Sequence, residues 1–202
     1  MVSLVTVGEY RGVETNLKQL FFWALKHTVR LHLSDHQRKT FQPIPNREGF
    51  GFRVYQKTPF KVIAIADLST SRIIGALQMK QEFETYPDGW ETRYVTVLPD
   101  YRGNGIGFTL YDLALNTEKM ILISSDEQTR LGLKMWRTLA AEPFVSVYAI
   151  TEQAYMETYL RKHKRKRQLP RKNLENRNVI FPLTKALVTD KNIRFIAFPI
   201  PY

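Results

Sequence analysis

The most constraining feature of the sequence is a glycine-rich turn between a predicted strand and a predicted helix. Trp90–Leu98 (WETRYVTVL) is rich in the β-branched and aromatic residues that favour strands. Arg102–Gly107 (RGNGIG) follows, and apolar residues then recur at helical spacing at Ile106, Leu110, Leu113 and Ala114. A helix N-terminus offers unpaired backbone N–H groups, and glycines let an anion approach them closely. The segment therefore predicts a phosphate-binding turn, to which Arg102 adds a positive charge.

Two other phosphate-binding motifs fit this spacing less well. A P-loop requires Lys and then Ser or Thr after its last glycine, whereas Phe108-Thr109 stands here. A dinucleotide-binding turn requires G-x-G-x-x-G and an acidic residue at the end of the next strand. The glycines here are Gly103, Gly105 and Gly107, and the next predicted strand ends at Ile123-Ser124. On spacing alone, a glycine turn without a ligand remains an alternative.

The rest of the chain predicts one mixed α/β domain, because 202 residues are too few for a second independent core. Further strands are predicted at Ser3–Val7, Phe60–Ala66, Arg72–Lys80, Met120–Ser124, Val145–Ile150, Val179–Leu183, Ala186–Thr189 and Ile193–Phe198. Helices are predicted at Glu14–Leu33, after a cap at Ser125 or Asp126, and at Thr151–Leu160. The second of these helices is expected to bury Leu131, Met135 and Leu139. The stretch containing Pro43, Pro45 and Gly49 is predicted to be irregular.

Composition excludes several classes of protein. The absence of cysteine excludes a disulfide scaffold, a thiolate nucleophile and a thiolate-based zinc site. His27 and His32 are poorly spaced for one metal, and His36 follows in a loop, so no metal site is predicted. Ser124-Ser125-Asp126 is interpreted as a strand end and helix cap rather than a nucleophile. No apolar run is long enough to span a bilayer, and Met1–Val7 does not resemble a secretion signal. We therefore expect a soluble, cytoplasmic protein.

The positive charge is concentrated in one short segment. Between Arg161 and Lys172 there are eight Lys or Arg residues and no acid, and subtracting these from the net charge of +11 leaves +3 for the remaining chain. Such a run can bind nucleic acid by releasing counterions, with Lys164, Arg165, Lys166 and Arg167 as candidate contacts. Tyr155 and Tyr159 precede the run and could stack on bases. A solvated insertion without a partner is the alternative.

The segment Val95–Gly107 resembles motif A of the GNAT superfamily of N-acetyltransferases. That motif is an apolar strand, a proline and then R/Q-x-x-G-x-G/A opening a helix, and Arg102, Gly105 and Gly107 match its defining positions. The order of elements from Ser3 to about Ile150 also matches. The resemblance implies an α+β fold with a mixed, mostly antiparallel central sheet flanked by helices. It implies a cofactor-binding core at 1–160, a basic insertion at 161–177 and C-terminal strands at 178–202 that complete the same domain.

The resemblance also implies an acetyl-CoA site. The pantetheine arm would lie between the strands Trp90–Leu98 and Met120–Ser124, bonded to the backbone around Val95 and Val97. The pyrophosphate would be held by backbone N–H groups of the turn and helix start, at Arg102, Gly103, Gly105, Gly107 and Phe108. Asn104 and Ile106 complete this cofactor-binding segment.

In this family an amine attacks the thioester directly, so the amine must lose a proton to a base. Glu91 is the first candidate for the base, because it lies eleven residues before Arg102, a spacing similar to that in the histone-acetylating branch. Glu82 and Glu84 are second candidates. The alternative for all three is a solvated acid without a catalytic role.

One position departs from the family pattern. Many members have a tyrosine in the last helix that protonates the leaving thiolate, and the best alignment places Trp136 there. Because an indole cannot supply that proton, Tyr148 or Tyr155 could serve, the thiolate could leave unprotonated, or the chain could bind without catalysis. Trp136 is interpreted as a core or pocket aromatic.

Three classes of function follow. The first is an acyl-CoA-dependent N-acyltransferase that moves an acetyl group to a primary amine. The second is a GNAT-fold protein that modifies nucleic acid, by phage DNA base modification or by acylation of aminoacyl-tRNA. The third is a non-catalytic interaction protein that keeps the fold.

Overall fold

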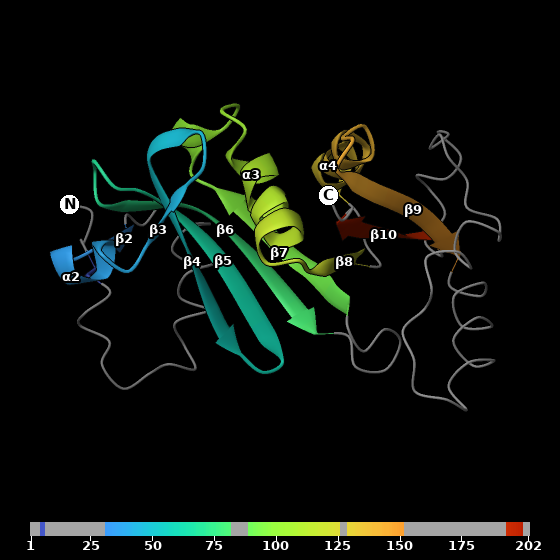
Figure 1. The fold of residues 1–202 in the computed structure, drawn as a ribbon, viewed down its shortest axis with the longest axis horizontal. Coiled ribbons are helices and arrows are strands. Elements are labelled where there is room, and N and C mark those ends of the chain that lie inside the picture. Colours follow the sequence, from blue (N-terminus) through green and yellow to red (C-terminus); the bar gives the residue numbers. More distant parts are fainter. Residues whose placement is uncertain (1–4, 7–30, 82–88, 126–128, 152–192, 200–202) are drawn as a thin grey trace. The chain divides into compact units, whose positions relative to one another are not determined.

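The computed structural model describes residues 5–6, 31–81, 89–125, 129–151 and 193–199 (Figure 1). The chain divides into two compact units. The first unit comprises Met1–Lys80 and Arg93–Leu113, and the second comprises Gln81–Thr92 and Ala114–Tyr202. Strand β7 (Gly89–Val97) contributes its beginning to the second unit and its end to the first. The fold is α+β, and antiparallel strand pairs predominate, as expected from the sequence.

The first unit is built on an antiparallel sheet. Its strands follow the order β3 (Gln42–Ile44), β4 (Arg47–Lys57), β5 (Phe60–Asp67) and β6 (Arg72–Gln81), with β7 next to β6. Two short strands, β1 (Val5–Thr6) and β2 (Leu31–His32), pair in parallel, and His32 also pairs with Arg72 of β6. A short helix, α2 (Asp35–Arg38), follows β2 and is capped by Ser34.

Strands β5 and β6 are buried on both faces, and one face is covered by helix α3 (Ile106–Asp112) (Figure 1). Gly75 of β6 makes this close packing possible. A Cβ atom at Gly75 would lie 2.9 Å from Cγ2 of Ile106. A 3-10 turn (Pro99–Tyr101) joins β7 to the segment before α3, and a π-helical turn (Leu113–Thr117) continues α3. The turn that precedes α3 is therefore fixed to a packed helix at one end and to a strand at the other.

The second unit contains the other part of the sheet. The first residues of β7 pair in parallel with β8 (Ile121–Ser124), from Gly89↔Ile121 to Thr92↔Ser124. The C-terminal strand β10 (Ile193–Pro199) is antiparallel to both β8 and β9 (Val145–Thr151) and lies between them. Helix α4 (Arg130–Ala140) packs on β9.

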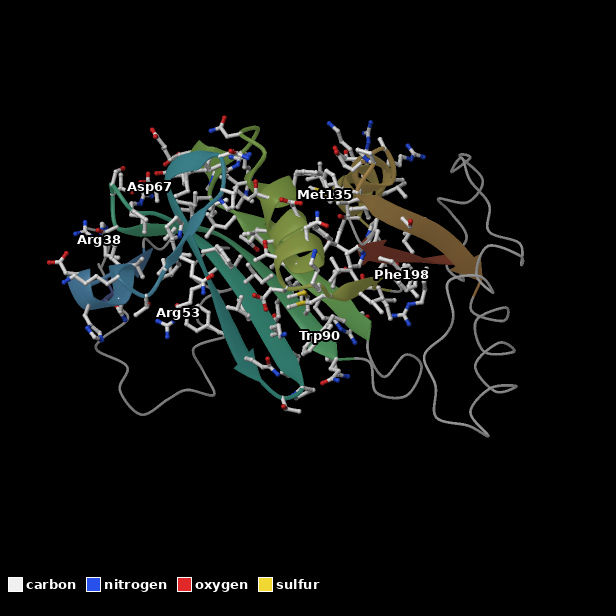
Figure 2. The ribbon with its side chains drawn as sticks, viewed as in Figure 1. Arg38, Arg53, Asp67, Trp90, Met135 and Phe198 are labelled. Atoms are coloured by element: carbon white, nitrogen blue, oxygen red, sulfur yellow. The ribbon has the colours of Figure 1, made fainter. Side chains whose placement is uncertain are left out.

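Three residues of α4 form its buried face, Leu133, Trp136 and Leu139. The Trp136 ring stacks on Phe195 of β10, with 5.8 Å between ring centroids. Figure 2 labels Met135, which precedes Trp136 on α4, and Phe198, which lies on β10 with Phe195. Trp136 is fully buried, so its interpretation as a core aromatic is confirmed.

Six of the predicted strands are confirmed to within one residue at either end. They are Phe60–Ala66, Arg72–Lys80, Trp90–Leu98, Met120–Ser124, Val145–Ile150 and Ile193–Phe198. The predictions for Ser3–Val7, Glu14–Leu33, Thr151–Leu160, Val179–Leu183, Ala186–Thr189 and the basic insertion 161–177 fall wholly or mostly outside the described residues.

Five predictions were wrong. His36, which was expected in a loop, lies in helix α2. The helix predicted to end at Leu33 cannot include Leu31–His32, which form β2. The stretch predicted to be irregular forms β3 and the start of β4, because β3 lies at the end of the strand order, where Pro43 need not supply an N–H. The cap of α4 is Thr129 rather than Ser125 or Asp126, since the Thr129 side chain accepts the N–H of Gly132 at 3.0 Å.

The fifth error concerns the buried face of α4. Leu131 was expected to be buried but is 78% exposed. The apolar residues of α4 allow two possible buried faces, one with Leu131 and one with Trp136. Trp136 stacks on Phe195, so the face with Trp136 is buried. Among the described residues, no helix has the length and apolar character needed to cross a bilayer.

Candidate functional site

The strongest candidate site is the exposed turn Arg102–Gly105, between β7 and α3. Gly103 and Gly105 have φ values of +84° and +75°, in the left-handed region that residues with a Cβ rarely adopt. Gly105 is the N-cap of α3, and its carbonyl accepts the N–H of Thr109 at 2.9 Å. The first N–H groups of α3 have no intrahelical acceptor, as in any helix. The turn therefore presents backbone donors beside two positions that only glycine occupies without strain.

A buried carboxylate anchors the start of this turn. The hydroxyl of Tyr101 donates to Oδ2 of Asp67 at 2.7 Å, and Asp67 is 8% exposed at the end of β5 (Figure 2). Oδ1 of Asp67 accepts the backbone N–H groups of Ser69 and Thr70 at 2.9 and 3.2 Å, and the Ser69 hydroxyl at 2.6 Å. Asp67 thus joins the β5–β6 connection to the segment that leads into the turn.

The ionised form of Asp67 is strongly favoured. Burial acts to raise its pKa, but the hydrogen bonds from Ser69, Tyr101 and Thr70 outweigh burial and hold the pKa at about 2, below the ordinary 3.8. Burial and the hydrogen bond to Asp67 raise the pKa of Tyr101. Both groups therefore keep their roles as acceptor and donor across the neutral range.

Two arginine side chains are fixed at the turn by hydrogen bonds to backbone carbonyls. Arg102 donates from Nε to the carbonyl oxygen of Val97 at 3.1 Å, which holds its side chain against the end of β7. Arg47, the first residue of β4, donates from Nη1 to the carbonyl oxygen of Asn104 at 3.0 Å. Arg102 was expected from the sequence, whereas Arg47 was missed. The only signal for Arg47 was the turn formed by Pro45-Asn46 immediately before it, and that stretch was interpreted as irregular.

Strand β7 is mostly buried at its beginning and exposed toward its end. Pairing with β8 ends at Thr92↔Ser124, whereas β7 continues to Val97. Beyond the paired residues the strand is exposed, with Tyr94 at 63% and Val95 at 39%. Val95 and Val97, which were expected to bond a pantetheine arm, therefore lie in the section of β7 beyond its pairing with β8.

Glu91 occupies a different environment from a solvated acid. It is 1% exposed, and its Oε1 lies 3.3 Å from Nη2 of Arg194 on β10. Arg194 also donates from Nε to the carbonyl oxygen of Ser124 at 3.2 Å. Ser124 is fully buried, and its Oγ accepts the N–H of Phe195 at 2.9 Å. Sequence reasoning singled out Glu91 but missed Arg194, which is brought to it only by strand pairing.

This buried ion pair connects three strands of the second unit. Glu91 lies on β7, Ser124 ends β8 and Arg194 lies on β10. A buried charge that loses its partner destabilises the fold strongly, because its desolvation is no longer compensated. Glu91 can therefore stabilise the end of the β7–β8 pairing whether or not it also transfers a proton.

Several predicted site residues fall outside the described residues. They are the second-choice bases Glu82 and Glu84, the alternative acid Tyr155, and the basic residues Lys164, Arg165, Lys166 and Arg167. The other alternative acid, Tyr148, lies in β9. Across the described ranges, no three His, Cys, Asp or Glu side chains gather as a metal site.

This chain is similar to a known protein family and to several solved structures. Residues 26–120 match the model of the acetyltransferase (GNAT) family. Among solved structures, the IAA acetyltransferase from Bacillus cereus ATCC 14579 is 15% identical over 70% of this chain and 79% of that chain, with a TM-score of 0.37. The ribosomal-protein-S18-alanine N-acetyltransferase from Escherichia coli is 11% identical over 73% of each chain, with a TM-score of 0.36.

A third similar structure is N-acetylglutamate synthase from Neisseria gonorrhoeae, complexed with coenzyme A and N-acetyl-glutamate. It is 12% identical, with a TM-score of 0.39, and the match covers 96% of this chain but 34% of that chain. No curated protein is detectably similar to this chain in sequence.

The anchoring role of Asp67 leads to a prediction about stability and pH. Because its pKa falls from 3.8 to about 2 on folding, ionised Asp67 should stabilise the fold by about 2 kcal/mol at pH 7. This contribution is present above the unfolded-state pKa and should be lost as the pH falls from about 4 to about 2. Asp67→Asn should therefore lower the free energy of unfolding in urea at pH 7, and the difference from the unmodified chain should shrink toward pH 3.

Tyr101→Phe is the matched control, because it removes one of the hydrogen bonds and leaves the carboxylate in place. It should cost about 1 kcal/mol and depend less on pH. Equal stability of Asp67→Asn and the unmodified chain at pH 7 would contradict the anchoring role.

Proposed function

Since residues 26–120 match the model of the acetyltransferase (GNAT) family, we propose that the chain transfers the acetyl group of acetyl-CoA to a primary amine. Acyl-CoA-dependent N-acyl transfer is the activity that the family match supports in general, and acetyl as the acyl group and a primary amine as acceptor are the specific parts of the proposal. Acetyl-CoA is a substrate here, so no resident cofactor is required.

The observation that carries the proposal is the turn Arg102–Gly105. Its left-handed glycines allow the backbone to approach a phosphate closely, and the adjoining helix start supplies N–H donors and a partial positive charge. The guanidinium groups of Arg47 and Arg102 add permanent positive charge beside it. Phosphate oxygens are well matched to such a set of donors.

The exposed end of β7 supports the placement of the rest of the donor. Beyond Thr92 the strand is not paired with β8, and Val95 is exposed there. An extended pantetheine arm carries amide groups that can bond to such a strand. We propose that Val95 and Val97 provide these backbone contacts and that the pyrophosphate binds along Arg102–Phe108.

The reaction requires one nucleophilic step and balanced proton transfers. The amine nitrogen attacks the thioester carbonyl carbon, the N–C bond forms and the C–S bond breaks. The amine loses a proton to a base, and the CoA sulfur leaves as a thiolate that is protonated by a side chain or by water. Trp136 cannot supply that proton, because it is fully buried and has no hydroxyl.

Glu91 is the proposed base, and the ion pair with Arg194 gives it a second role in the fold. The ion pair supports the catalytic proposal, because the guanidinium of Arg194 holds the Glu91 carboxylate in one position. Its low exposure requires that an amine reach it directly or through water. Measurements of rate and of stability can separate the two roles.

The glycine turn leads to a prediction about donor binding. Acetyl-CoA should bind with a micromolar Kd, on the order of −8 kcal/mol. Gly105→Ala should weaken binding roughly tenfold or more, because a side chain strains the left-handed backbone. In addition, its Cβ would lie 2.8 Å from Nη2 of Arg47. Isothermal titration calorimetry with acetyl-CoA measures the change.

Gly49→Ala is the control for backbone strain. Gly49 has a φ of +78° in β4, and a Cβ there would meet nothing within 4 Å. It should lower stability in the same way as Gly105→Ala and leave the Kd for acetyl-CoA unchanged. Absence of binding to the unmodified chain at millimolar acetyl-CoA would refute the proposed function.

The proposed base leads to a prediction about rate. Glu91→Gln should lower kcat by roughly 10²–10⁴ while the Kd for acetyl-CoA changes little. The deficit should shrink at high pH, where the acceptor amine is already deprotonated. The measurement is a pH–rate profile with a small panel of primary amines.

Glu142→Gln, the same substitution elsewhere in the second unit, is the control and should leave kcat unchanged. If Glu91 serves only the ion pair, Glu91→Gln should instead lower the free energy of unfolding, by about 3–5 kcal/mol, and the rate of the remaining folded protein should be normal. That result would remove Glu91 from the catalytic mechanism.

The class of acceptor depends on a part of the chain outside the described residues. The basic run Arg161–Lys172 is the feature that favours a nucleic-acid or ribonucleoprotein acceptor over a small amine. The roles proposed for Lys164, Arg165, Lys166 and Arg167 rest on the sequence alone. Retention on heparin that falls steeply with salt would support this alternative.

A further inference from the structure

The position of Arg47 is fixed by the β3–β4 hairpin. It is the first residue of β4 and pairs with Ile44 of β3 across the hairpin loop Pro45-Asn46. Asn46 has a φ of +59°, so the loop reverses tightly, and Ile44 is buried. The backbone of Arg47 is therefore fixed by strand pairing on one side and by a tight turn on the other.

The side chain of Arg47 ends against the glycine turn. Its Nη1 donates to the carbonyl oxygen of Asn104 at 3.0 Å, and its Nη2 lies 2.8 Å from the point where a Cβ of Gly105 would be. The absence of a side chain at Gly105 thus leaves room for this guanidinium. One of its five N–H donors is used by Asn104, which fixes the plane of the group beside the turn.

Among the described residues, neither Arg47 nor Arg102 has a carboxylate within ion-pair distance. The Arg47 side chain is held to Asn104 of the turn, and the Arg102 side chain is held to Val97 at the end of β7. Placing two permanent cations at one turn costs free energy unless an anion binds there. A guanidinium also binds phosphate oxygens through two parallel hydrogen bonds, which a single ammonium group does not do.

We propose that Arg47 binds a phosphate group of acyl-CoA and contributes to selecting CoA over donors that lack that phosphate. This inference rests on the proposed function and adds a ligand-binding residue from a strand outside the β7–α3 segment. CoA carries two kinds of phosphate, the pyrophosphate and the ribose 3′-phosphate, and both offer the oxygens that a guanidinium binds.

The test compares two arginine variants and two ligands. Arg47→Gln removes the guanidinium, and Arg53→Gln makes the same change of charge on the same strand. Arg53 lies six residues farther along β4, about 20 Å at the rise of a strand, and bonds to Thr40 and lies over the ring of Tyr55. Figure 2 labels Arg53. The full-length variants are titrated calorimetrically with CoA and with 3′-dephospho-CoA.

Arg47→Gln should bind CoA roughly 10- to 100-fold more weakly than the unmodified chain, whereas Arg53→Gln should bind it normally. If the 3′-phosphate is the partner, the loss should appear with CoA and disappear with 3′-dephospho-CoA. If the pyrophosphate is the partner, both ligands should lose affinity equally. Arg47→Lys should recover part of the loss, because it restores charge without the planar donor pair.

Three other outcomes are possible, and they differ in what they overturn. Equal CoA affinity for Arg47→Gln and the unmodified chain would refute the role of Arg47 and leave the proposed function standing. The same refutation follows if Arg47→Gln and Arg53→Gln lose affinity equally, because the effect would then be general charge. Failure of the unmodified chain to bind CoA would overturn the proposed function and this inference with it.

Discussion

The candidate site depends on the backbone conformation between β7 and α3. Gly103 and Gly105 both adopt left-handed φ values, and the chain passes through them from an exposed strand end into a helix packed on β5 and β6. A side chain at either position would strain the turn. At Gly105 it would also occupy the space that the guanidinium of Arg47 borders. The same constraint therefore sets the shape of the turn and the position of its charge.

The turn is held by contacts from segments that are distant in sequence. Asp67, at the end of β5, accepts the hydroxyl of Tyr101, and Arg47, at the start of β4, donates to Asn104. Both anchors come from the same end of the β4–β5 pair, because Phe50 of β4 is opposite Asp67. One end of the β4–β5 pair thus supports the exposed loop through two hydrogen bonds, and such support helps a binding loop to keep its shape before a ligand arrives.

The second unit has its own organising contact, the buried pair of Glu91 and Arg194. Arg194 also bonds to the carbonyl oxygen of Ser124, where the pairing of β7 with β8 ends. This contact makes Glu91 a structural tie within the second unit, and the proposed role as base adds a second function. The proposal assigns both roles to one carboxylate, and each role has its own measurable consequence.

Local sequence signals predicted much of the fold and part of the site. The strands from β5 to β10 were predictable because β-branched and apolar residues continue through each of them, and the glycine turn was predictable because three glycines follow a strand. The β3–β4 hairpin was not, because Pro43 and Pro45 normally mark irregular chain and only the edge position of β3 permits them. Arg47 and Arg194 could not be found either, since Arg47 meets Asn104 and Arg194 meets Glu91 only across long sequence separations.

We propose above all that the turn Arg102–Gly105 and the start of α3 bind the phosphates of CoA. The most direct measurement is an amide NMR titration of the ¹⁵N-labelled full chain with CoA and, in parallel, with pantetheine, which has no phosphate. The amide signals of Gly103, Gly105 and Gly107 should shift with CoA and should not shift with pantetheine. Unchanged glycine signals at saturating CoA, or equal shifts with both ligands, would contradict the proposal.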